Sequence, residues 1–362
     1  RLFKRSYQLA NIVRKSMKVD TGKIRESEKL DWEKLESQLR SFMELPDSEM
    51  AVAQFHGGHA NLSYEICFGD RCYVLRRPPF GKIAPGAHDM KREYKVLSKL
   101  NEYYPMAPKA YYFCDDESII GAPFVIMERR YGIVVRYKVP EVFEGMKDVE
   151  QRLTDALIDA HAALHQVDYK KAELEDLGRV EGFLERQIRG WMKRWQLLTG
   201  MTNDRLSSVF KALLETIPDS DHFSIIHNDF KFDNCQFEHG QPDKVSSVFD
   251  WDMSTLGDPL FDFASSLAYW PDEKLQGFNL PIMLHGNFPD KNYLKERYFD
   301  ITGFDASYFK WYECLAYAKT AVIASQLFKR FKKGDSQDQR MQKFEAITEV
   351  FIYQSEMYMK DI

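Results

Sequence analysis

Four polar residues with a characteristic spacing lie in one short stretch, His227, Asp229, Lys231 and Asn234, and apolar runs flank them on both sides. Such a stretch is typical of a catalytic loop held between two buried strands. In phosphoryl-transfer loops with this spacing, the aspartate accepts the proton of the attacking hydroxyl, and the asparagine five positions later turns its amide oxygen to Mg²⁺. The pattern predicts Asp229 as a catalytic base, with an ordinary polar turn as the alternative.

A second acidic position follows this stretch. The run Val245–Phe249 is typical of a strand and ends at Asp250. Because Asp250 follows Asn234 closely, we expect the strands that carry them to be neighbours. Mg²⁺ prefers oxygen and usually takes one or two protein carboxylates besides phosphate oxygens and water. Asn234 and Asp250 are therefore the predicted metal ligands.

The stretches HNDFKFDN and FDWDMSTLGDPLFDFAS resemble the aminoglycoside phosphotransferase superfamily. They are most similar to the branch that includes stand-alone bacterial phosphotransferases and the kinase-like domains fused to some acyl-CoA dehydrogenases. The resemblance runs from about Asp31 to the C-terminus and is strongest between Phe223 and Ser266. It implies an α+β, two-lobed protein-kinase-like fold, with a small antiparallel-sheet N-lobe and a mostly helical C-lobe.

The same resemblance implies ATP and Mg²⁺ as cofactors and transfer of the γ-phosphoryl group to a hydroxyl of a small molecule. Asp229 would be the base, and Lys231 would offset the charge that grows on the γ group. A family resemblance does not fix the substrate. Hydroxy acids, hydroxyacyl thioesters and amino alcohols are the acceptor classes that we consider, and the sequence does not indicate an oligomeric state.

Three regions are expected along the chain: a basic extension over residues 1–30, a nucleotide-binding N-lobe over 31–130, and a C-lobe over 131–362 with the catalytic loop, the metal site and the acceptor site. Five strands are expected in the N-lobe, at Met50–Phe55, Leu62–Phe68, Arg71–Pro79, Ala110–Cys114 and Pro123–Glu128. Helices are expected after an N-cap at Asp31 and over His88–Leu100.

The first two of these strands are joined by a hairpin that contains Gly57, Gly58 and Asn61. Paired glycines let backbone N–H groups approach an anion closely, so the hairpin is expected to cover the phosphates of ATP. The kinase G-x-G-x-x-G pattern is absent, and an ordinary hairpin turn fits the same residues equally well.

In kinase-like proteins, the third strand carries a Lys that binds the α- and β-phosphates and pairs with a Glu on the next helix. Arg76 stands at this position, and Glu93 is its expected partner; Lys82 is a second candidate for the phosphates. Arginine binds phosphate bidentately, but it is not a neutral exchange for Lys. The fifth strand ends at Glu128, where backbone groups of residues 128–130 are expected to hydrogen-bond adenine.

Helical patterns before the catalytic stretch cover Val149–Val167, Arg179–Thr199 and Arg205–Ile217. The first carries His161 and His165 four residues apart on one face. Because Ala162 replaces the glutamate of an H-E-x-x-H site and no third ligand is evident, we interpret both histidines as structural.

Beyond Asp250, Asp258 is predicted to cap a helix that begins at Pro259. Asp258 and Asp262 are expected to hold the catalytic loop in shape through hydrogen bonds to backbone or Arg groups. Asp252 is ambiguous and is not predicted as a ligand. The remainder of the chain is helical and aromatic, and the resemblance implies that its late helices wall the acceptor site.

Composition excludes several classes of protein. A hydrophobic content of 44% and a charged content of 29% are ordinary for a globular protein. The formal net charge of −5 argues against general nucleic-acid binding. No apolar run approaches the ~20 residues of a transmembrane helix. The five cysteines are odd in number and lack CxxC spacing, which favours the cytoplasm or another reducing compartment.

The basic extension holds nine Lys or Arg residues against three Asp or Glu residues. It is expected to dock on its own domain, with an amphipathic helix that touches a membrane or partner as the alternative. Because the chain begins with Arg1, a residual targeting peptide is a further interpretation of this extension.

Two other functions compete with a small-molecule kinase. Lys231 is compatible with a protein kinase, but no D-F-G triplet follows Asn234 and no A-P-E closes an activation segment. Arg76 and the irregular Gly57–Gly58 turn are compatible with a nucleotide-binding module that has lost catalysis.

Overall fold

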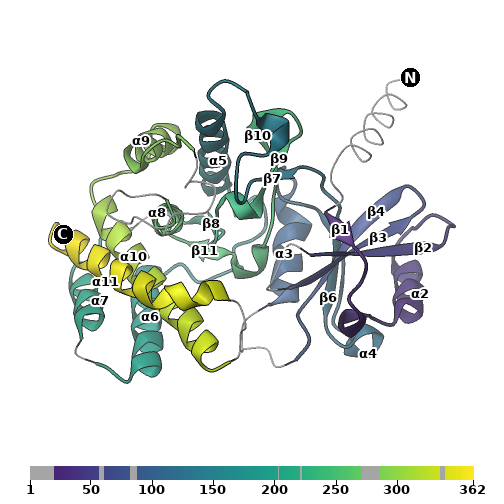
Figure 1. Cartoon of the computed structure of the whole chain (residues 1–362), viewed down its shortest axis with the longest axis horizontal. Helices are drawn as coiled ribbons and strands as arrows, with labels where there is room; N and C mark the ends of the chain where they lie inside the picture. Colours follow the sequence, from purple (N-terminus) through teal and green to yellow (C-terminus); the bar gives the residue numbers. More distant parts are fainter. Residues whose placement is uncertain are drawn as a thin grey trace. The chain divides into compact units, whose positions relative to one another are not determined.

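The chain folds into two compact units, shown in Figure 1. The computed structural model describes residues 20–56, 61–81, 88–202, 204–220, 222–270, 286–334 and 339–362. The first unit comprises Arg1–Ile133, Gln236–Gln241 and Ser246–Ser254, and the second comprises Val134–Cys235, Pro242–Val245 and Thr255–Ile362. Gly57, Gly58, Lys82 and the first 19 residues of the basic extension lie outside the described residues, so the expectations on them stay predictions.

The first unit is built on a six-stranded antiparallel sheet. Its strands, in spatial order, are β1 (Thr21–Gly22), β2 (Met50–Phe55), β3 (Leu62–Phe68), β4 (Arg71–Arg77), β6 (Phe124–Glu128) and β5 (Ala110–Cys114). The five predicted strands are present. The sixth, β1, was not predicted, because two residues are too short to show alternation. It pairs with β2 and joins part of the expected extension to the sheet.

Helices cover both sides of this sheet (Figure 1). On one side, α2 (Trp32–Phe42) and α4 (Glu117–Ile120) pack on a core that includes Leu35, Ile66 and Phe124. On the other side, α3 (Met90–Leu100) packs against β5 and β6. Asp31 caps α2 as predicted, since its side chain accepts the N–H of Lys34. α3 therefore brings Glu93 to the sheet that carries Arg76.

The second unit is mostly helical. Its helices are α5 (Val149–His165), α6 (Phe183–Thr199), α7 (Arg205–Glu215), α8 (Pro259–Leu267), α9 (Lys291–Thr302), α10 (Phe309–Lys332) and α11 (Phe344–Met359). α10 packs against α6, α7, α8 and α11, and α5 packs against α9. A short antiparallel pair, β8 (Ser224–Ile226) and β11 (Thr255–Gly257), lies beside α5 and α8. None of the described helices is both long and apolar enough to span a bilayer.

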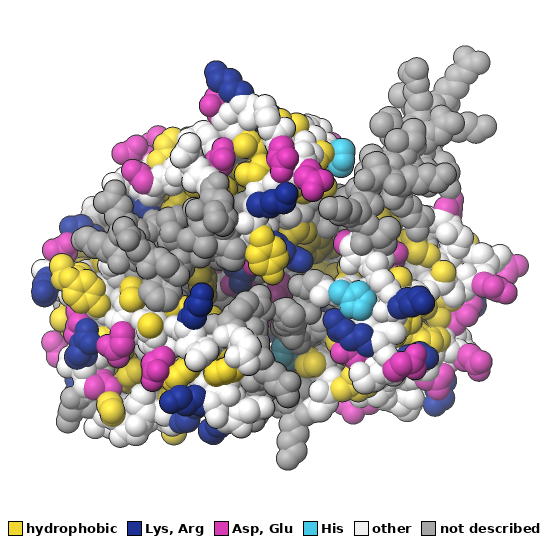
Figure 2. All heavy atoms as spheres, viewed as in Figure 1, with side chains coloured by type: hydrophobic (Ala, Val, Ile, Leu, Met, Phe, Trp, Pro, Cys, Tyr) yellow, Lys and Arg dark blue, Asp and Glu magenta, His cyan; other side chains and the backbone are white. Residues whose placement is uncertain are grey.

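Three further strands, β7 (Ile133–Val134), β9 (Cys235–Glu238) and β10 (Gln241–Val248), form a sheet in the order β10-β9-β7. β9 and β10 are neighbours, as predicted from the spacing of Asn234 and Asp250. β10 begins several residues before the predicted Val245. On the face shown in Figure 2, Lys and Arg side chains are interspersed with Asp and Glu.

The cysteines differ from the sequence interpretation. Cys67 and Cys72 face each other in the β3–β4 hairpin and form a disulfide, while Cys114, Cys235 and Cys314 are free and buried. Strand register brings this pair together, so a search for CxxC spacing cannot find it. The disulfide removes part of the basis for a reducing compartment, which stays a prediction.

Gly257 in β11 allows a close approach that a side chain would block. A Cβ atom there would lie 2.5 Å from Cδ1 of Ile226 and 2.6 Å from Cζ of the buried Phe183. We expect Gly257→Ala to lower the free energy of unfolding by about 1–3 kcal/mol, because the Phe183 ring has little room to move.

The matched control is Gly190→Ala in α6, where a Cβ meets nothing within 4 Å. This change should raise stability by about 0.5–1 kcal/mol, because alanine favours the helix. Urea unfolding followed by circular dichroism measures both variants. Equal effects of the two substitutions would contradict the close packing at Gly257.

Candidate active site

The predicted catalytic stretch lies in the second unit. β8 ends at Ile226, one residue before His227, and a 3-10 turn over Phe232–Asn234 leads directly into β9. β8 is anchored by its pairing with β11, in which Leu256 lies opposite Ile225. β8 and β9 are both largely buried, so they fix the two ends of the loop.

Asp229 is oriented by two side chains of its own loop. The Lys231 ammonium lies 2.7 Å from each carboxylate oxygen of Asp229. The Asn234 amide nitrogen donates to Oδ2 of Asp229 at 2.9 Å and to its backbone oxygen at 2.8 Å. This donation turns the amide oxygen of Asn234 away from Asp229. The carboxylate keeps a quarter of its surface exposed, so a small molecule can reach it.

The charge of Lys231 is set by opposing effects. Burial lowers the pKa of Lys231, but the Asp229 carboxylate and its hydrogen bond raise that pKa above its usual value. Lys231 therefore stays protonated at neutral pH. It places a positive charge beside the candidate base, where phosphoryl transfer requires neutralisation of negative charge.

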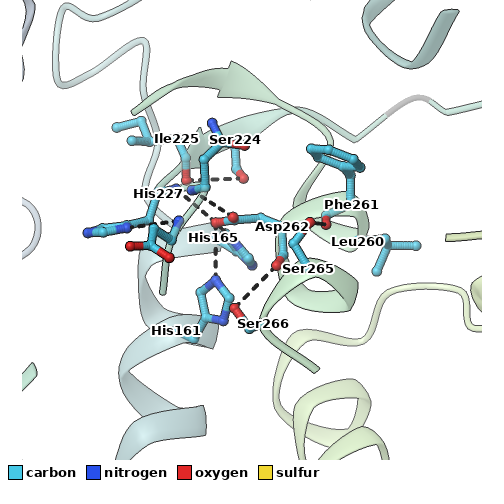
Figure 3. Close-up of polar contacts among 12 residues, drawn as sticks. His161, His165, Ser224, Ile225, His227, Leu260, Phe261, Asp262, Ser265 and Ser266 are labelled. Carbon is cyan, nitrogen blue, oxygen red and sulfur yellow. Dashed lines mark hydrogen bonds and ion pairs between the residues drawn. The ribbon is translucent and has the colours of Figure 1, made fainter. Parts of the chain in front are cut away.

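Asp262 anchors the start of the loop, and Figure 3 shows its contacts with His227, His161 and His165. It lies in the first turn of α8, which Pro259 begins and Asp258 caps as predicted. Its Oδ1 accepts the backbone N–H of Asn228 at 2.7 Å, and its Oδ2 accepts the N–H of His227 at 2.8 Å. Asn228 has a φ of 68°, so these bonds hold a left-handed backbone directly before the candidate base.

Asp258, in contrast, does not contact the loop among the described residues. It accepts hydrogen bonds from the hydroxyls of Ser220 and Tyr312 and from the N–H of Leu260. The expectation that both aspartates hold the loop is thus confirmed for Asp262 and wrong for Asp258. Asp258 instead ties the start of α8 to α10.

The two histidines of α5 complete the anchor. Nε2 of His161 and of His165 lie 3.1 and 3.2 Å from Oδ2 of Asp262, and Nδ1 of His165 lies 2.7 Å from the Tyr298 hydroxyl. Because an ionised carboxylate only accepts, both Nε2 atoms carry the protons. These hydrogen bonds agree with the structural role expected for the histidines, which stays a prediction, and the sequence interpretation missed Asp262 as their common partner.

The protonation states of this cluster follow from its burial. Burial lowers the pKa of His161 to about 4, with the neighbouring His165 acting in the same direction. Burial opposes ionisation of Asp262, but hydrogen bonds from both histidines hold its pKa well below the usual range. The three groups have potential metal-binding atoms within 4.8 Å of one another. Their mutual hydrogen bonds, together with the loop amides on Asp262, already use these atoms.

A second polar cluster lies in the first unit, around Arg76 on β4. Its guanidinium forms ion pairs with Asp250 and, at 3.3 Å, with Glu93 on α3. The predicted pairing of Arg76 with Glu93 is therefore present. Burial raises the pKa of Glu93 to about 7, and Asp250 and Asp252 add to this effect against Arg76. Asp250, a predicted metal ligand, has a φ of 69° and is left-handed like Asn228.

The chemistry of this cluster fits a cation. Glu93, Asp250 and Asp252 place three carboxyl groups around Arg76, and burial with the nearby Asp250 raises the pKa of Asp252. The amide nitrogen of Asn61 donates to Asp252 at 3.2 Å, whereas its buried amide oxygen has no hydrogen-bond partner in the part of the chain that the structure describes. Mg²⁺ prefers oxygen ligands. The cluster offers more carboxyl groups than Arg76 can neutralise, together with the Asn61 amide oxygen that has no hydrogen-bond donor among the described residues.

Glu128 ends β6 at the expected hinge. Its backbone N–H already donates to the Lys109 carbonyl at 2.8 Å, and its carboxylate pairs with Arg130 at 2.8 Å. An adenine contact in this region would therefore use the Glu128 carbonyl or a neighbouring backbone group. The predicted site residues thus fall into two groups, one in each unit.

Comparisons with known proteins agree with this geometry. The sequence profile of the phosphotransferase enzyme family matches residues 51–297. Acyl-CoA dehydrogenase family member 11 from Rattus norvegicus is 30% identical over 335 residues, which cover 88% of this chain and 42% of that protein. The chain thus spans about two fifths of the length of such curated relatives.

Solved structures give the same result. A Ralstonia eutropha structure assigned to the aminoglycoside phosphotransferases superposes with a TM-score of 0.76 at 27% identity, covering 92% of this chain and 99% of that one. A thermostable mutant of aminoglycoside phosphotransferase APH(4)-Ia in a ternary complex with ADP and hygromycin B has a TM-score of 0.53 at 15% identity, covering 87% and 97%. At that identity, the second comparison shows the fold alone.

The fold and the family profile define the class: a protein-kinase-like phosphotransferase. The chain belongs to the phosphotransferase enzyme family, whose profile covers more than half of its length. The predicted similarity to the aminoglycoside phosphotransferases and to proteins of the acyl-CoA dehydrogenase branch is confirmed.

Asp262→Asn tests the anchor of the loop. An amide cannot accept from all four donors, so we expect the free energy of unfolding to fall by about 3 kcal/mol. The matched control is Asp159→Asn on α5, whose side chain is about half exposed and pairs with Arg297. That change should cost less than about 1 kcal/mol. Urea unfolding measures both variants, and equal losses of unfolding free energy would contradict the role of Asp262 as the anchor of the loop.

The neutral His161 predicts a pH dependence of stability. The pKa of His161 is about 4 in the folded chain against 6.5 as its ordinary value. Between these values the unfolded chain binds a proton that the folded chain does not, so stability falls as the pH decreases from about 6.5 toward 4. His161→Leu should flatten this slope by up to about 1.4 kcal/mol per pH unit. Unfolding at several pH values measures it, and an unchanged slope would contradict the assignment.

Proposed function

We propose that the chain is an ATP- and Mg²⁺-dependent kinase that phosphorylates a hydroxyl group of a small molecule. The single observation that carries this proposal is the Asp229 carboxylate, held by Lys231 and Asn234 and still open to solvent. A carboxylate with this support can orient a hydroxyl and take its proton while the oxygen attacks the γ-phosphorus.

The catalytic roles in the second unit follow from these contacts. Asp229 accepts the proton of the acceptor hydroxyl. Lys231 keeps its positive charge next to Asp229 and offsets the charge that develops on the transferred group. Asn234 offers its amide oxygen to a metal ion because its nitrogen is already bonded to Asp229.

The first unit supplies the groups for the nucleotide in this proposal. Arg76 binds the α- and β-phosphates, and Glu93 fixes the position of Arg76. Asp250 would be the second metal ligand, and Mg²⁺ held there would neutralise charge on the phosphate oxygens. Asn61 covers the phosphates, and the backbone at Glu128 contacts adenine. Residues 31–130 serve as the nucleotide-binding lobe and residues 131–362 as the catalytic lobe.

The acceptor is a small hydroxyl compound, for which hydroxy acids, hydroxyacyl thioesters and amino alcohols form the first panel. The APH(4)-Ia structure is a ternary complex with ADP and hygromycin B, which supports a nucleotide and a small-molecule acceptor for this fold. Release of ADP with each panel member identifies the substrate class. Nucleotide binding without ADP release would favour a module that has lost catalysis.

Asp229→Asn and Asp250→Asn test the two assigned carboxylates. We expect each variant to lower kcat about 10²–10⁴-fold, because one removes the proton acceptor and the other a metal ligand. The matched control is Asp243→Asn on β10, which is exposed and pairs with Arg152. It should keep normal turnover. Circular dichroism checks that all three fold, and normal turnover in Asp229→Asn would sink the assignment of the base.

A further inference from the structure

Lys319 brings a charge into the interior of the second unit. It lies in the middle of α10, is 4% exposed, and donates from Nζ to the Ser265 hydroxyl at 3.1 Å. The same nitrogen lies 4.8 Å from the centre of the Phe261 ring. Ser265 donates its own hydrogen to the Phe261 carbonyl at 2.8 Å, so its oxygen is the acceptor for Lys319.

Both contacts of Lys319 belong to α8, the helix that carries Asp262. Phe261 directly precedes Asp262, and Ser265 follows Asp262 by three residues, so Lys319 holds α8 on both sides of the anchor. Asp262 in turn fixes the backbone of His227 and Asn228. The contacts therefore connect α10 to the candidate catalytic loop through one helix.

Charged groups from three elements act on Lys319. Burial lowers the pKa of Lys319 to about 8. The carboxylates of Asp262 in α8 and Asp229 in the loop raise this pKa, whereas the cations Arg194 in α6 and Lys231 in the loop lower it further. Lys231 is paired directly with Asp229, and the Arg194 guanidinium lies 4.3 Å from the centre of the Trp191 ring. Of the three cations Lys319, Lys231 and Arg194, Lys319 is thus the fully buried one, and it contacts α8, the helix that carries Asp262.

The sign of the linkage separates a stabilising role from a functional one. The pKa of Lys319 is about 8 in the folded chain against 10.5 as its ordinary value. At a pH below about 8, the folded chain carries a charge that burial disfavours, and this penalty is relieved as the pH rises from 8 to 10.5. A buried charge that lowers stability beside an active site is the pattern expected of a group retained for activity.

We propose that Lys319 is a positioning residue for phosphoryl transfer. Its ammonium holds α8 and balances the Asp262 carboxylate, which keeps the loop of Asp229 in its left-handed, catalytically competent conformation. The catalytic part of this inference rests on the proposed function, whereas the structural part applies to the chain without substrate.

Three variants test the proposal: Lys319→Met, Lys319→Arg and, as the matched control on the same helix, Lys332→Met. Lys332 is exposed, so its loss removes one charge without touching α8. We expect Lys319→Met to lower kcat about 10–100-fold with little change in KM for ATP, because a loop displaced by a fraction of an ångström misplaces the base. Its Tm should stay level or rise, Lys319→Arg should keep most of the activity, and Lys332→Met should match the parent chain.

The pH profile gives a readout that simple packing does not predict. Deprotonation of Lys319 should make kcat fall as the pH rises above about 8, while stability changes in the opposite direction. Lys319→Arg keeps its charge throughout, so its kcat should not fall in that range. An alkaline fall that persists in Lys319→Arg, or a drop in kcat explained by a lower Tm of Lys319→Met, would overturn the proposal.

Hydrogen exchange tests the structural part without any acceptor. The backbone amides of His227 and Asn228, which bond to Asp262, should exchange about tenfold faster in Lys319→Met and at the parental rate in Lys332→Met. Unchanged exchange in Lys319→Met would overturn the proposal. If no hydroxyl compound is phosphorylated, the proposed function fails, and the exchange rates alone decide the role of Lys319.

Discussion

The buried carboxylate of Asp262 is the interaction on which the second unit depends. A fully buried carboxylate is tolerated only when donors saturate it, and Asp262 has four: two backbone amides of the catalytic loop and the imidazoles of His161 and His165. Each hydrogen bond to a charged group adds about 1.5–3 kcal/mol to the free energy of unfolding, and the loss of one donor lowers that free energy by at least as much. The loop conformation, the histidine protonation and the position of α8 are therefore determined together.

The two candidate site groups differ in their balance of charge. Around Arg76 there are three carboxyl groups, and the pKa of Glu93 is raised to about 7 by its burial and its acidic neighbours. Near Asp229, the cations Lys231 and Lys319 are matched by the carboxylates of Asp229 and Asp262. Left-handed non-glycine residues, Asn228 and Asp250, occur in both groups. Perturbed ionisation and strained backbone together are typical of sites retained for chemistry rather than for stability.

Local patterns in the sequence predicted the elements that position the site. Alternating strands β2 to β4, the caps at Asp31 and Asp258, and the apolar runs around Asp229 depend on neighbours in the chain, and the structure contains them where expected. The role of Asp262 could also be anticipated from its place in the first turn of a helix near the loop. Family resemblance extended these local signals to the fold as a whole.

The missed features depend on contacts between distant residues. β1 exists because it pairs with β2, and the disulfide follows from the register of β3 and β4. His161 and Asp262 are 101 residues apart, so spacing within the helix could not show the partner of the histidine. Lys319 looks like an ordinary helix lysine until its burial against α8 is known.

The most direct test of the central claim follows the phosphoryl group itself. The chain is incubated with Mg²⁺, ATP labelled with ³²P at the γ position, and the panel of hydroxyl compounds, and the label is then traced by chromatography. The account predicts label in a small phosphate monoester, in proportion to the ADP released. Label confined to protein, label confined to inorganic phosphate, or unconsumed ATP would contradict it.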